Sequence, residues 1–384
     1  MEVYFDNSAT TRCHPKVREV MNKIYDEDYG NPSSLHMMGV RAEAYLKEAR
    51  KTLAAILKAN EKEIFFTSGG TESDNLAIIG TAMANKRRGT HIITTSIEHA
   101  AVLEPMKFLE EQGFRVTYLP VDEKGVVDLK ALSEVLCEET ILVSVMAVNN
   151  EIGTVEPLED IAKIIKAKNP GTYFHVDAIQ GFGKLKYYPK RMGIDMLSVS
   201  GHKINGPKGV GFLYINEKVR IKPLILGGGQ QKGMRSGTDN VPGIAGLRCA
   251  AELAYENFEE KQTYLYSLRN RMLAGLKEMD GVTVNGYDDD TAAPHIISAS
   301  FKNVRSEVLL HKLEERGIYV SAGSACSSNK PAPSRTLINI HAPKEIIEST
   351  VRFSFAVSNT AEEVDYCLET LKEIIPELQK YVRK

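Results

Sequence analysis

Short apolar runs alternate along the chain with longer segments in which hydrophobic residues recur every three or four positions. The short runs are typical of buried strands, and the longer spacing is typical of amphipathic helices. Helices are predicted at 36–58, 71–85, 99–112, 128–136 and 157–169, and strands at 63–68, 91–96, 114–121, 140–148, 173–179, 196–200 and 209–216. This alternation favours an α/β fold with a mostly parallel, doubly wound sheet, because helices then connect successive strands.

The pattern changes after Gly243. A long helical stretch is predicted to run to about Met279. It is followed by a strand-like segment at 295–301, a helix at 307–317 and a loop at 321–334. Another strand at 351–356 and a final helix up to Tyr381 complete the pattern. We therefore expect a large domain at residues 15–255 and a smaller α+β domain at 256–384, which residues 1–14 join.

Composition narrows the class of protein. Hydrophobic residues make up 43% of the 384 residues and charged residues 26%, which is ordinary globular usage. The net charge of −2 gives no indication of a nucleic-acid or membrane partner. The polar start of the chain has no signal-peptide core. Five scattered cysteines without a CxxC pair argue against a disulfide framework or a metal site. We expect a cytoplasmic protein of enzyme size.

Residues 68–75, SGGTESDN, end a predicted strand and begin a helix. Free backbone N–H groups at a helix N-terminus form an anion site, and the glycines allow close approach. The segment lacks the spacing of a nucleotide-binding P-loop. It predicts a site for a phosphate at Gly70 and Thr71, unless the turn is merely structural.

Lys203 follows a predicted strand, and Asp177 lies toward the C-terminal end of another. A desolvated lysine can react with an aldehyde, and a buried carboxylate needs a cationic partner. Pyridoxal 5′-phosphate (PLP) offers both, because a lysine binds its aldehyde and a carboxylate pairs with its protonated ring nitrogen. Ligands of open α/β sheets lie at the carboxyl ends of strands, so these two residues and the phosphate site are expected to meet.

These residues belong to segments that resemble the class V aminotransferases, which are fold-type I PLP enzymes, and among them the NifS/IscS-like cysteine desulfurases. The matching segments are YFDNSATT, GNPSSLH, TSGGTESDNLAI, IEHAAV, NNEIGT, HVDAIQ, SGHKINGPKGVG, GGGQQKGMRSGT, GSACSS and VRFSF, in family order from residue 4 to about 355. The resemblance implies the PLP-dependent transferase fold type I. One departure is Gln231, which stands where the family usually has an acidic residue, so an ion pair is not expected there.

The resemblance also implies a role for each matching residue. Lys203 would hold PLP, Asp177 would pair with its ring nitrogen, Gln180 would donate to its phenolic oxygen, and His99 would stack on the ring. Gly70, Thr71, Ser200 and His202 would bind the phosphate together with Thr238 of the other subunit, and Asn150 and Arg352 would bind the substrate carboxylate. His99 begins a predicted helix, whose N-terminus favours the neutral imidazole. Arg352 has the planar fork that suits a carboxylate.

Cys326 matches the family's sulfur-accepting nucleophile. Glycine, serine and alanine surround it on a loop without a packing pattern, so we expect a mobile thiol that reaches the site and a partner protein. Cys137, Cys249 and Cys367 lie in helical apolar patterns and are expected to be structural. Cys13, beside His14, is left open as a reactive thiol.

Together these features predict a PLP-dependent cysteine desulfurase, a sulfurtransferase. It would convert L-cysteine to L-alanine and form a persulfide on Cys326, with Lys203 taking the Cα proton. A homodimer and a protein sulfur acceptor, such as an iron–sulfur scaffold, are further expectations. A selenocysteine lyase, an aminotransferase and a non-catalytic sulfur-handling scaffold are the alternatives. The scaffold would need neither Lys203 nor Asp177.

Overall fold

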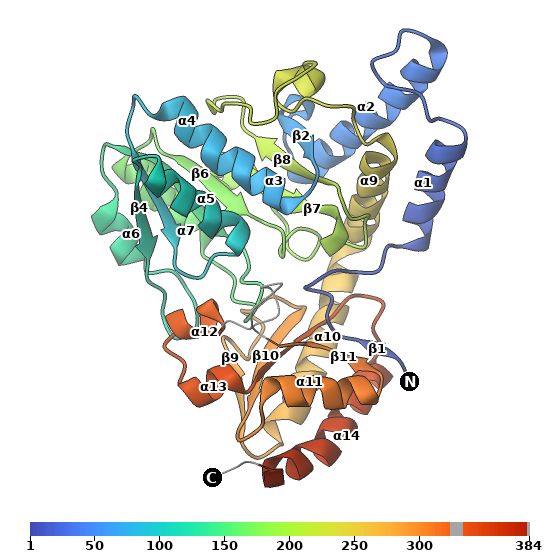
Figure 1. Cartoon of the computed structure of the whole chain (residues 1–384), viewed down its shortest axis with the longest axis vertical. Coiled ribbons are helices and arrows are strands. Elements are labelled where there is room, and N and C mark those ends of the chain that lie inside the picture. Colours follow the sequence, from blue (N-terminus) through green and yellow to red (C-terminus); the bar gives the residue numbers. More distant parts are fainter. Residues whose placement is uncertain (323–332, 382–384) are drawn as a thin grey trace.

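The computed structural model describes residues 1–322 and 333–381. Figure 1 shows a larger upper part, which is built from the blue to yellow residues, and a smaller lower part, which is built mainly from the orange and red C-terminal residues. The N-terminus lies beside the smaller part. Among the described residues, no helix combines the length and the hydropathy that crossing a bilayer requires.

A large sheet forms the centre of the upper part. Within the described residues its seven strands run in the order β2 (Ile64–Thr67), β8 (Gly211–Ile215), β7 (Met196–Ser200), β6 (Tyr173–Asp177), β5 (Thr140–Met146), β3 (His91–Thr95) and β4 (Arg115–Leu119). Strand β8 is antiparallel to both neighbours, and the other pairs are parallel. The prediction of a mostly parallel sheet is therefore confirmed.

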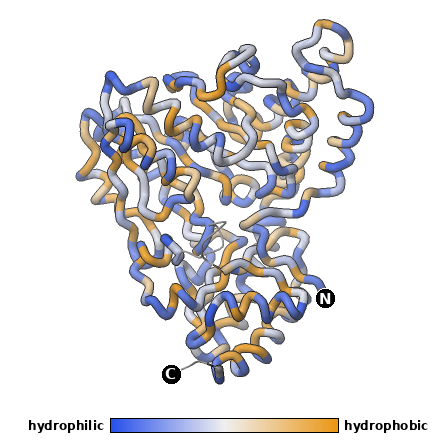
Figure 2. Tube along the Cα trace, viewed as in Figure 1, coloured by the Kyte–Doolittle hydropathy of each residue, from blue (hydrophilic) through white to orange (hydrophobic). Residues whose placement is uncertain are grey.

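Helices cover both faces of this sheet. Val143 of β5 packs in one hydrophobic cluster with α1 (Pro15–Asp26), α2 (Met37–Leu57), α6 (Leu129–Val135), α7 (Leu158–Lys168) and α9 (Val241–Tyr255). The next residue back, Leu142, packs in another cluster with α5 (Ala100–Glu111) and the helical segment before it. Successive strand residues point to opposite faces, which explains why β5 is buried throughout. Hydrophobic and hydrophilic stretches alternate along the outer helices (Figure 2).

Three helical segments differ from the prediction. The helix expected at 71–85 is a continuous path through α3 (Gly70–Asn75), a π-helical turn (Leu76–Gly80) and α4 (Thr81–Asn85). The long helix expected up to Met279 is broken between α9 and α10 (Phe258–Lys277), because Asn257 adopts a left-handed conformation with φ of 48°. Helix α1 was not predicted, although Pro15 at its first position is a typical start signal.

The smaller part has its own core. Its four strands among the described residues run in the order β12 (Ser321–Ala322), β13 (Thr350–Ser354), β10 (Ile296–Phe301) and β9 (Val282–Asn285), and all pairs are antiparallel. Helices α10, α11 (Ser306–Glu315) and α14 (Ala361–Leu378) pack on it. Two short helices of this part are α12 (Arg335–Asn339) and α13 (Lys344–Glu348), whereas the short helix α8 (Pro189–Met192) belongs to the larger part.

The N-terminal segment belongs to this second core. Strand β1 (Val3–Tyr4) pairs in parallel with β11 (Ile318–Tyr319), and Val3 and Phe5 are completely buried there. Residues 6–11 then cross toward the large sheet, where Thr11 donates to the backbone oxygen of His202. We propose that residues 15–255 and 256–384 are the two domains and that residues 1–14 join the second.

Candidate active site

A cavity of about 300 Å³ lies at the carboxyl ends of β6 and β7, against the smaller part. Predicted site residues from several separate segments line it: Gly70, Thr71, His99, Asn150, Asp177, Gln180, Ser200, His202, Lys203 and Arg352. The wall also includes Ser8, Ala9 and apolar side chains such as Met146 and Ile179. The strand ends therefore bring the predicted groups together, as expected for an open α/β sheet.

Lys203 lies just after β7, in a short 3₁₀ turn. Its ammonium group donates to the backbone oxygen atoms of Ser8 and Ala9. Both carbonyl groups belong to the N-terminal segment, which also holds the loop after Lys203 through Thr11 Oγ1, 2.7 Å from the Asn205 nitrogen. No role was predicted for Ser8 or Ala9. The signal for them was the matching segment YFDNSATT, whose small residues allow close backbone approach.

Asp177 ends β6 and is buried. Its Oδ1 accepts a hydrogen bond from the backbone nitrogen of Ile179 at 2.9 Å. Burial raises the pKa of Asp177 to about 6, although the Ile179 N–H group and the Lys203 charge act against that rise. A carboxylate whose ionised form is destabilised by burial gains from a cation placed in the same cavity. A protonated pyridine ring fits this requirement.

A fully buried polar layer lies behind Asp177. His175 Nδ1 lies 2.8 Å from Ser144 Oγ, and its Nε2 lies 2.9 Å from Ser198 Oγ and 3.6 Å from Asp74 Oδ1. Burial lowers the pKa of His175 to about 3, so its ring is neutral. Burial and the Asp177 charge raise the pKa of Asp74. This layer was not predicted from the sequence, where its signal is polar residues within otherwise apolar elements.

His99 caps the N-terminus of α5. Its Nδ1 accepts a hydrogen bond from the backbone nitrogen of Ala101 at 3.1 Å, which leaves the proton of the neutral ring on Nε2. Burial, followed by the Lys203 charge, lowers the pKa of His99. The predicted position at a helix start is confirmed, and the imidazole is neutral near pH 7.

The start of α3 supplies a cradle for an anion. Gly69 has φ of 150° and ψ of −169°, a conformation that is essentially restricted to glycine. A Cβ atom on Gly70 would lie 2.1 Å from Ile179 Cδ1, so a side chain cannot be placed there without displacing the cavity wall. Thr71 and Ser200 add hydroxyl groups. Backbone N–H groups and hydroxyls of this kind suit a phosphate group.

Arg352 projects from β13 and is 4% exposed. Its Nη1 donates to the backbone oxygen of Asn150 at 2.8 Å, and its Nε atom is buried without a hydrogen-bond partner. Gln180 Nε2 donates to the Ser8 oxygen at 2.9 Å, but its Oε1 has no partner. Ser8 Oγ is unpartnered as well. Since buried polar atoms are normally satisfied, these three atoms indicate a polar ligand and fit PLP with a substrate carboxylate.

One predicted site residue in the described part of the chain does not line this cavity, and another lies outside that part. Thr238 is exposed and lies outside it within this chain. Cys326 lies outside the described residues. Of the remaining cysteines, Cys249 and Cys367 are in α9 and α14. The prediction of a helical position was wrong for Cys137, which follows α6 and is only partly buried.

Two further residues are clarified by their surroundings. Burial raises the pKa of the Cys13 thiol, so it is less reactive than a free cysteine. The side-chain amide of Gln231 makes two hydrogen bonds with the Phe66 backbone, as a neighbouring strand would. Its Oε1 accepts from the Phe66 nitrogen at 2.7 Å, and its Nε2 donates to the Phe66 oxygen at 2.9 Å. Both partners are backbone groups of the edge strand β2. An acidic side chain could not make the second bond.

The geometry agrees with what this chain is similar to. Residues 3–367 match the model of the family described as "Aminotransferase class-V". Cysteine desulfurase IscS of Clostridium botulinum (strain Hall) is 47% identical over 97% of this chain and 94% of that protein. A solved NifS-like protein superposes with a TM-score of 0.93 at 43% identity, covering 98% of this chain and all of that one.

Another solved structure, SspA in complex with cysteine, has a TM-score of 0.78 at 35% identity, covering 93% of this chain and all of that one. The similarity covers the cavity and both hydrophobic cores, because the matched residues include nearly every described helix and strand. The chain therefore belongs to the aminotransferase class-V family of PLP-dependent enzymes, within the group of NifS/IscS-like cysteine desulfurases.

Proposed function

We propose that this protein removes sulfur from L-cysteine, releases L-alanine and forms a persulfide on Cys326. The observation that carries the proposal is one cavity in which Lys203, Asp177, His99 and Arg352 meet. A relative with nearly full-length similarity is a cysteine desulfurase, and a solved neighbour is a complex with cysteine.

PLP, when bound, supplies an electron-withdrawing ring that stabilises negative charge at the substrate Cα. Asp177 would hold the protonated ring nitrogen, which offsets the burial of its own carboxylate. Gly70, Thr71, Ser200 and His202 would hold the phosphate group at the start of α3. Burial lowers the pKa of His202 to about 4, so it would act as a neutral hydrogen-bonding group there.

Lys203 and His99 would move protons. The Ser8 and Ala9 carbonyl groups hold the Lys203 side chain within the cavity. Its Nζ, in the neutral amine form, would take the proton from the substrate Cα. His99 keeps its own proton on Nε2 because Nδ1 is used by the helix cap. The Nε2 atom can therefore donate a proton within the cavity and be restored by solvent or by Lys203.

Arg352 would bind the substrate carboxylate. Its guanidinium is oriented by Asn150 before substrate arrives, and its buried Nε donor remains available. The Cys326 thiolate would attack the substrate sulfur. The new S–S bond forms as the Cβ–S bond breaks, the electron pair of that bond stays on carbon, and protonation of that carbon gives alanine.

The test is a single turnover of the purified PLP-loaded protein with L-cysteine. Alanine and enzyme-bound persulfide should appear in equal amounts, and mass mapping should place the persulfide on Cys326. Cys326→Ala should lose persulfide formation, whereas the matched variant Cys137→Ala should keep it. A keto acid that retains the sulfur in place of alanine, with pyridoxamine phosphate left on the protein, would indicate an aminotransferase. Alanine release by Cys326→Ala only from selenocysteine would indicate a selenocysteine lyase.

The remaining expectations concern assembly and location. A homodimer in which Thr238 reaches the partner's phosphate site would explain why Thr238 is exposed here. An iron–sulfur scaffold would be a suitable acceptor for the persulfide. A cytoplasmic location agrees with the free thiols of Cys13, Cys137, Cys249 and Cys367, since reducing compartments preserve thiols. Light scattering with wild-type protein and Thr238→Ala, together with PLP retention, tests the dimer and its shared site.

A further inference from the structure

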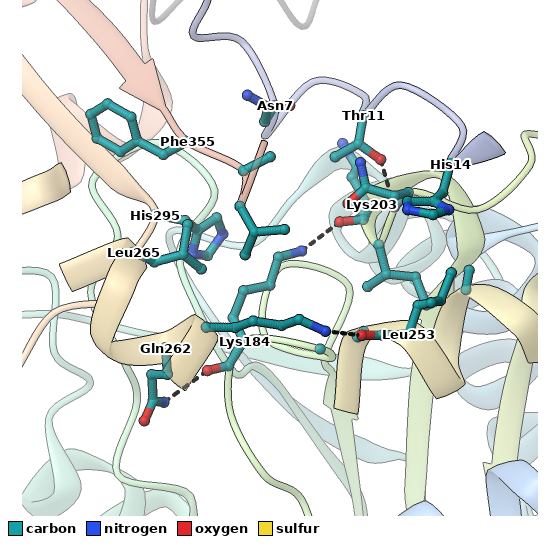
Figure 3. A pocket seen from close by; sticks show the side chains of 18 of the residues that line it. Asn7, Thr11, His14, Lys184, Lys203, Leu253, Gln262, Leu265, His295 and Phe355 are labelled. Atoms are coloured by element: carbon teal, nitrogen blue, oxygen red, sulfur yellow. Dashed lines mark hydrogen bonds between the residues drawn. The ribbon is translucent and has the colours of Figure 1, made fainter. Parts of the chain in front are cut away.

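A second cavity, of about 140 Å³, also has Lys203 among its lining residues (Figure 3). It is bounded by α9, α10, the segment after β13 and the N-terminal segment. Lys203 is shared with the cavity described above, but the other lining residues differ. The apolar wall includes Leu253, Ala254, Phe258, Leu265 and Phe355.

The polar groups of this cavity that carry the argument are Lys184, Gln262 and the buried His295. Lys184 donates through Nζ to the backbone oxygen of Lys203, and the Lys184 oxygen accepts from Gln262 Nε2 at 2.9 Å. His295 is 1% exposed, and neither of its ring nitrogens has a hydrogen-bond partner. In Figure 3 the His295 ring and the Lys184 side chain both lie at the cavity. A buried imidazole without partners is costly and indicates a missing polar group.

Lysine side chains, and no acidic ones, line this cavity in the described part of the chain: Lys184, Lys203 and Lys261. Lys203 interacts with the Asp177 charge, and Lys261 Nζ donates to the Leu253 oxygen. Burial, and after it the Lys203 charge, lowers the pKa of Lys184 to about 7. Burial and then the Lys184 charge lower the pKa of His295 as well, so its ring is neutral. An anion beside Lys184 would offset the cost of burying its charge.

The volume, the apolar wall and the polar groups of this cavity together indicate the kind of ligand that it binds. We propose that this cavity binds a compact apolar carboxylate, with the carboxylate held by Lys184 and His295 and the apolar group packed against Phe258, Leu265 and Phe355. A cavity of about this size accepts a molecule such as benzene. Larger fatty acids would not fit, and a free inorganic anion would leave the apolar wall unfilled.

Such a ligand would affect Lys203 through Lys184. Lys184 is the direct contact between this cavity and the Lys203 backbone. A carboxylate that draws the Lys184 ammonium toward itself would compete with the Lys203 carbonyl for the same donor. Occupancy would therefore shift the loop that carries Lys203, without blocking the cavity in which L-cysteine is proposed to react.

The experiment is calorimetric titration of the PLP-loaded protein with sodium benzoate. Benzoate could also bind Arg352, so the titration is made in wild-type protein and in Arg352→Met, which lacks that carboxylate site. One benzoate per chain should still bind to Arg352→Met. Benzyl alcohol, which has the same ring without the charge, should bind at least about tenfold more weakly.

Variants then locate the site. Adding Lys184→Met or His295→Phe to Arg352→Met should each weaken benzoate binding by at least about tenfold. Lys208→Met, which removes an exposed lysine outside the cavity, should leave binding unchanged. Thermal unfolding checks each variant, and His295→Phe carries the test if Lys184→Met does not fold. The proposal is overturned if Arg352→Met shows no saturable benzoate binding, or if the folded cavity variants bind benzoate as tightly as Arg352→Met does.

Discussion

Arg352 Nη2 donates to Asp6 Oδ1 at 2.9 Å, although the two residues are 346 positions apart in the chain. The ion pair is largely desolvated, since the Arg352 side chain is 4% exposed and that of Asp6 is 21% exposed. Arg352 also donates to the Asn150 oxygen. The planar guanidinium is thus fixed on two sides, with its Nε atom left as an unpartnered buried donor.

Arg352→Lys should raise the KM for L-cysteine by at least about tenfold with a smaller change in kcat. A lysine ammonium cannot reproduce the fork that contacts both Asp6 and Asn150 and still offer a donor to a carboxylate. Steady-state sulfide release measures both constants. Arg305→Lys, at an arginine with a 79% exposed side chain, is the control and should change neither. An unchanged KM in Arg352→Lys would contradict the assigned role.

His99→Asn should separate the capping role of His99 from its chemical role. Asparagine is a favourable N-cap, so the free energy of unfolding should stay within about 0.5 kcal/mol of wild type, whereas His99→Ala should lose about 1 kcal/mol. Both variants should lose activity by about 10² or more, because neither can transfer a proton through Nε2. Denaturant unfolding and turnover assays together measure this. Substantial activity in His99→Asn would show that capping alone is required.

Gln231→Glu should destabilise the protein by about 1–3 kcal/mol. The carboxylate keeps the bond from the Phe66 nitrogen, but it loses the donor to the Phe66 oxygen and places charge against that carbonyl. Gln230→Glu is a matched control, since Gln230 uses only its Oε1, as acceptor from the Gly237 nitrogen. Urea unfolding should show the loss for Gln231→Glu alone, and equal stability of both variants would disprove this account.

Glu156→Gln should stabilise the protein increasingly as pH rises. Glu156 is buried, its Oε1 has no partner, and burial raises its pKa to about 8 from a usual value of 4.5. The unfolded state then holds fewer protons than the native state between these two values, so wild-type stability falls across that interval. The variant should gain on the order of 2–4 kcal/mol above about pH 8 and little below about pH 4. Unfolding curves across this range measure the difference, and a gain that is independent of pH would refute the cause.

Hydrophobic periodicity was sufficient for the large sheet. Strand β5 is a mostly apolar run between amphipathic helices, and this pattern arises from burial on both faces. The break between α9 and α10 was not predictable in this way, because Asn257 takes a left-handed conformation inside an otherwise helical composition. The π-helical turn after Asn75 likewise leaves the hydrophobic pattern of its helix intact.

The candidate site was predictable where a short sequence motif itself contains the reactive residue. Lys203 follows β7 and Asp177 ends β6. Parallel strands end at the same edge of a sheet, so the meeting of these two residues followed from the fold class. Contacts made by backbone groups were not accessible, as in the Ser8 and Ala9 carbonyls on Lys203. The same holds for Lys184 and His295, whose significance depends on which residues surround them in space.

The joining of the N-terminal segment to β11 and to Ser354 has a consequence for biosynthesis. On the ribosome, residues 3–11 emerge first, but their pairing partners at 318–319 and 354 are translated more than three hundred positions later. Until then the nascent chain has no Ser8 or Ala9 carbonyl docked on Lys203. Cofactor capture is therefore expected to be a post-translational event, after both ends of the polypeptide have met.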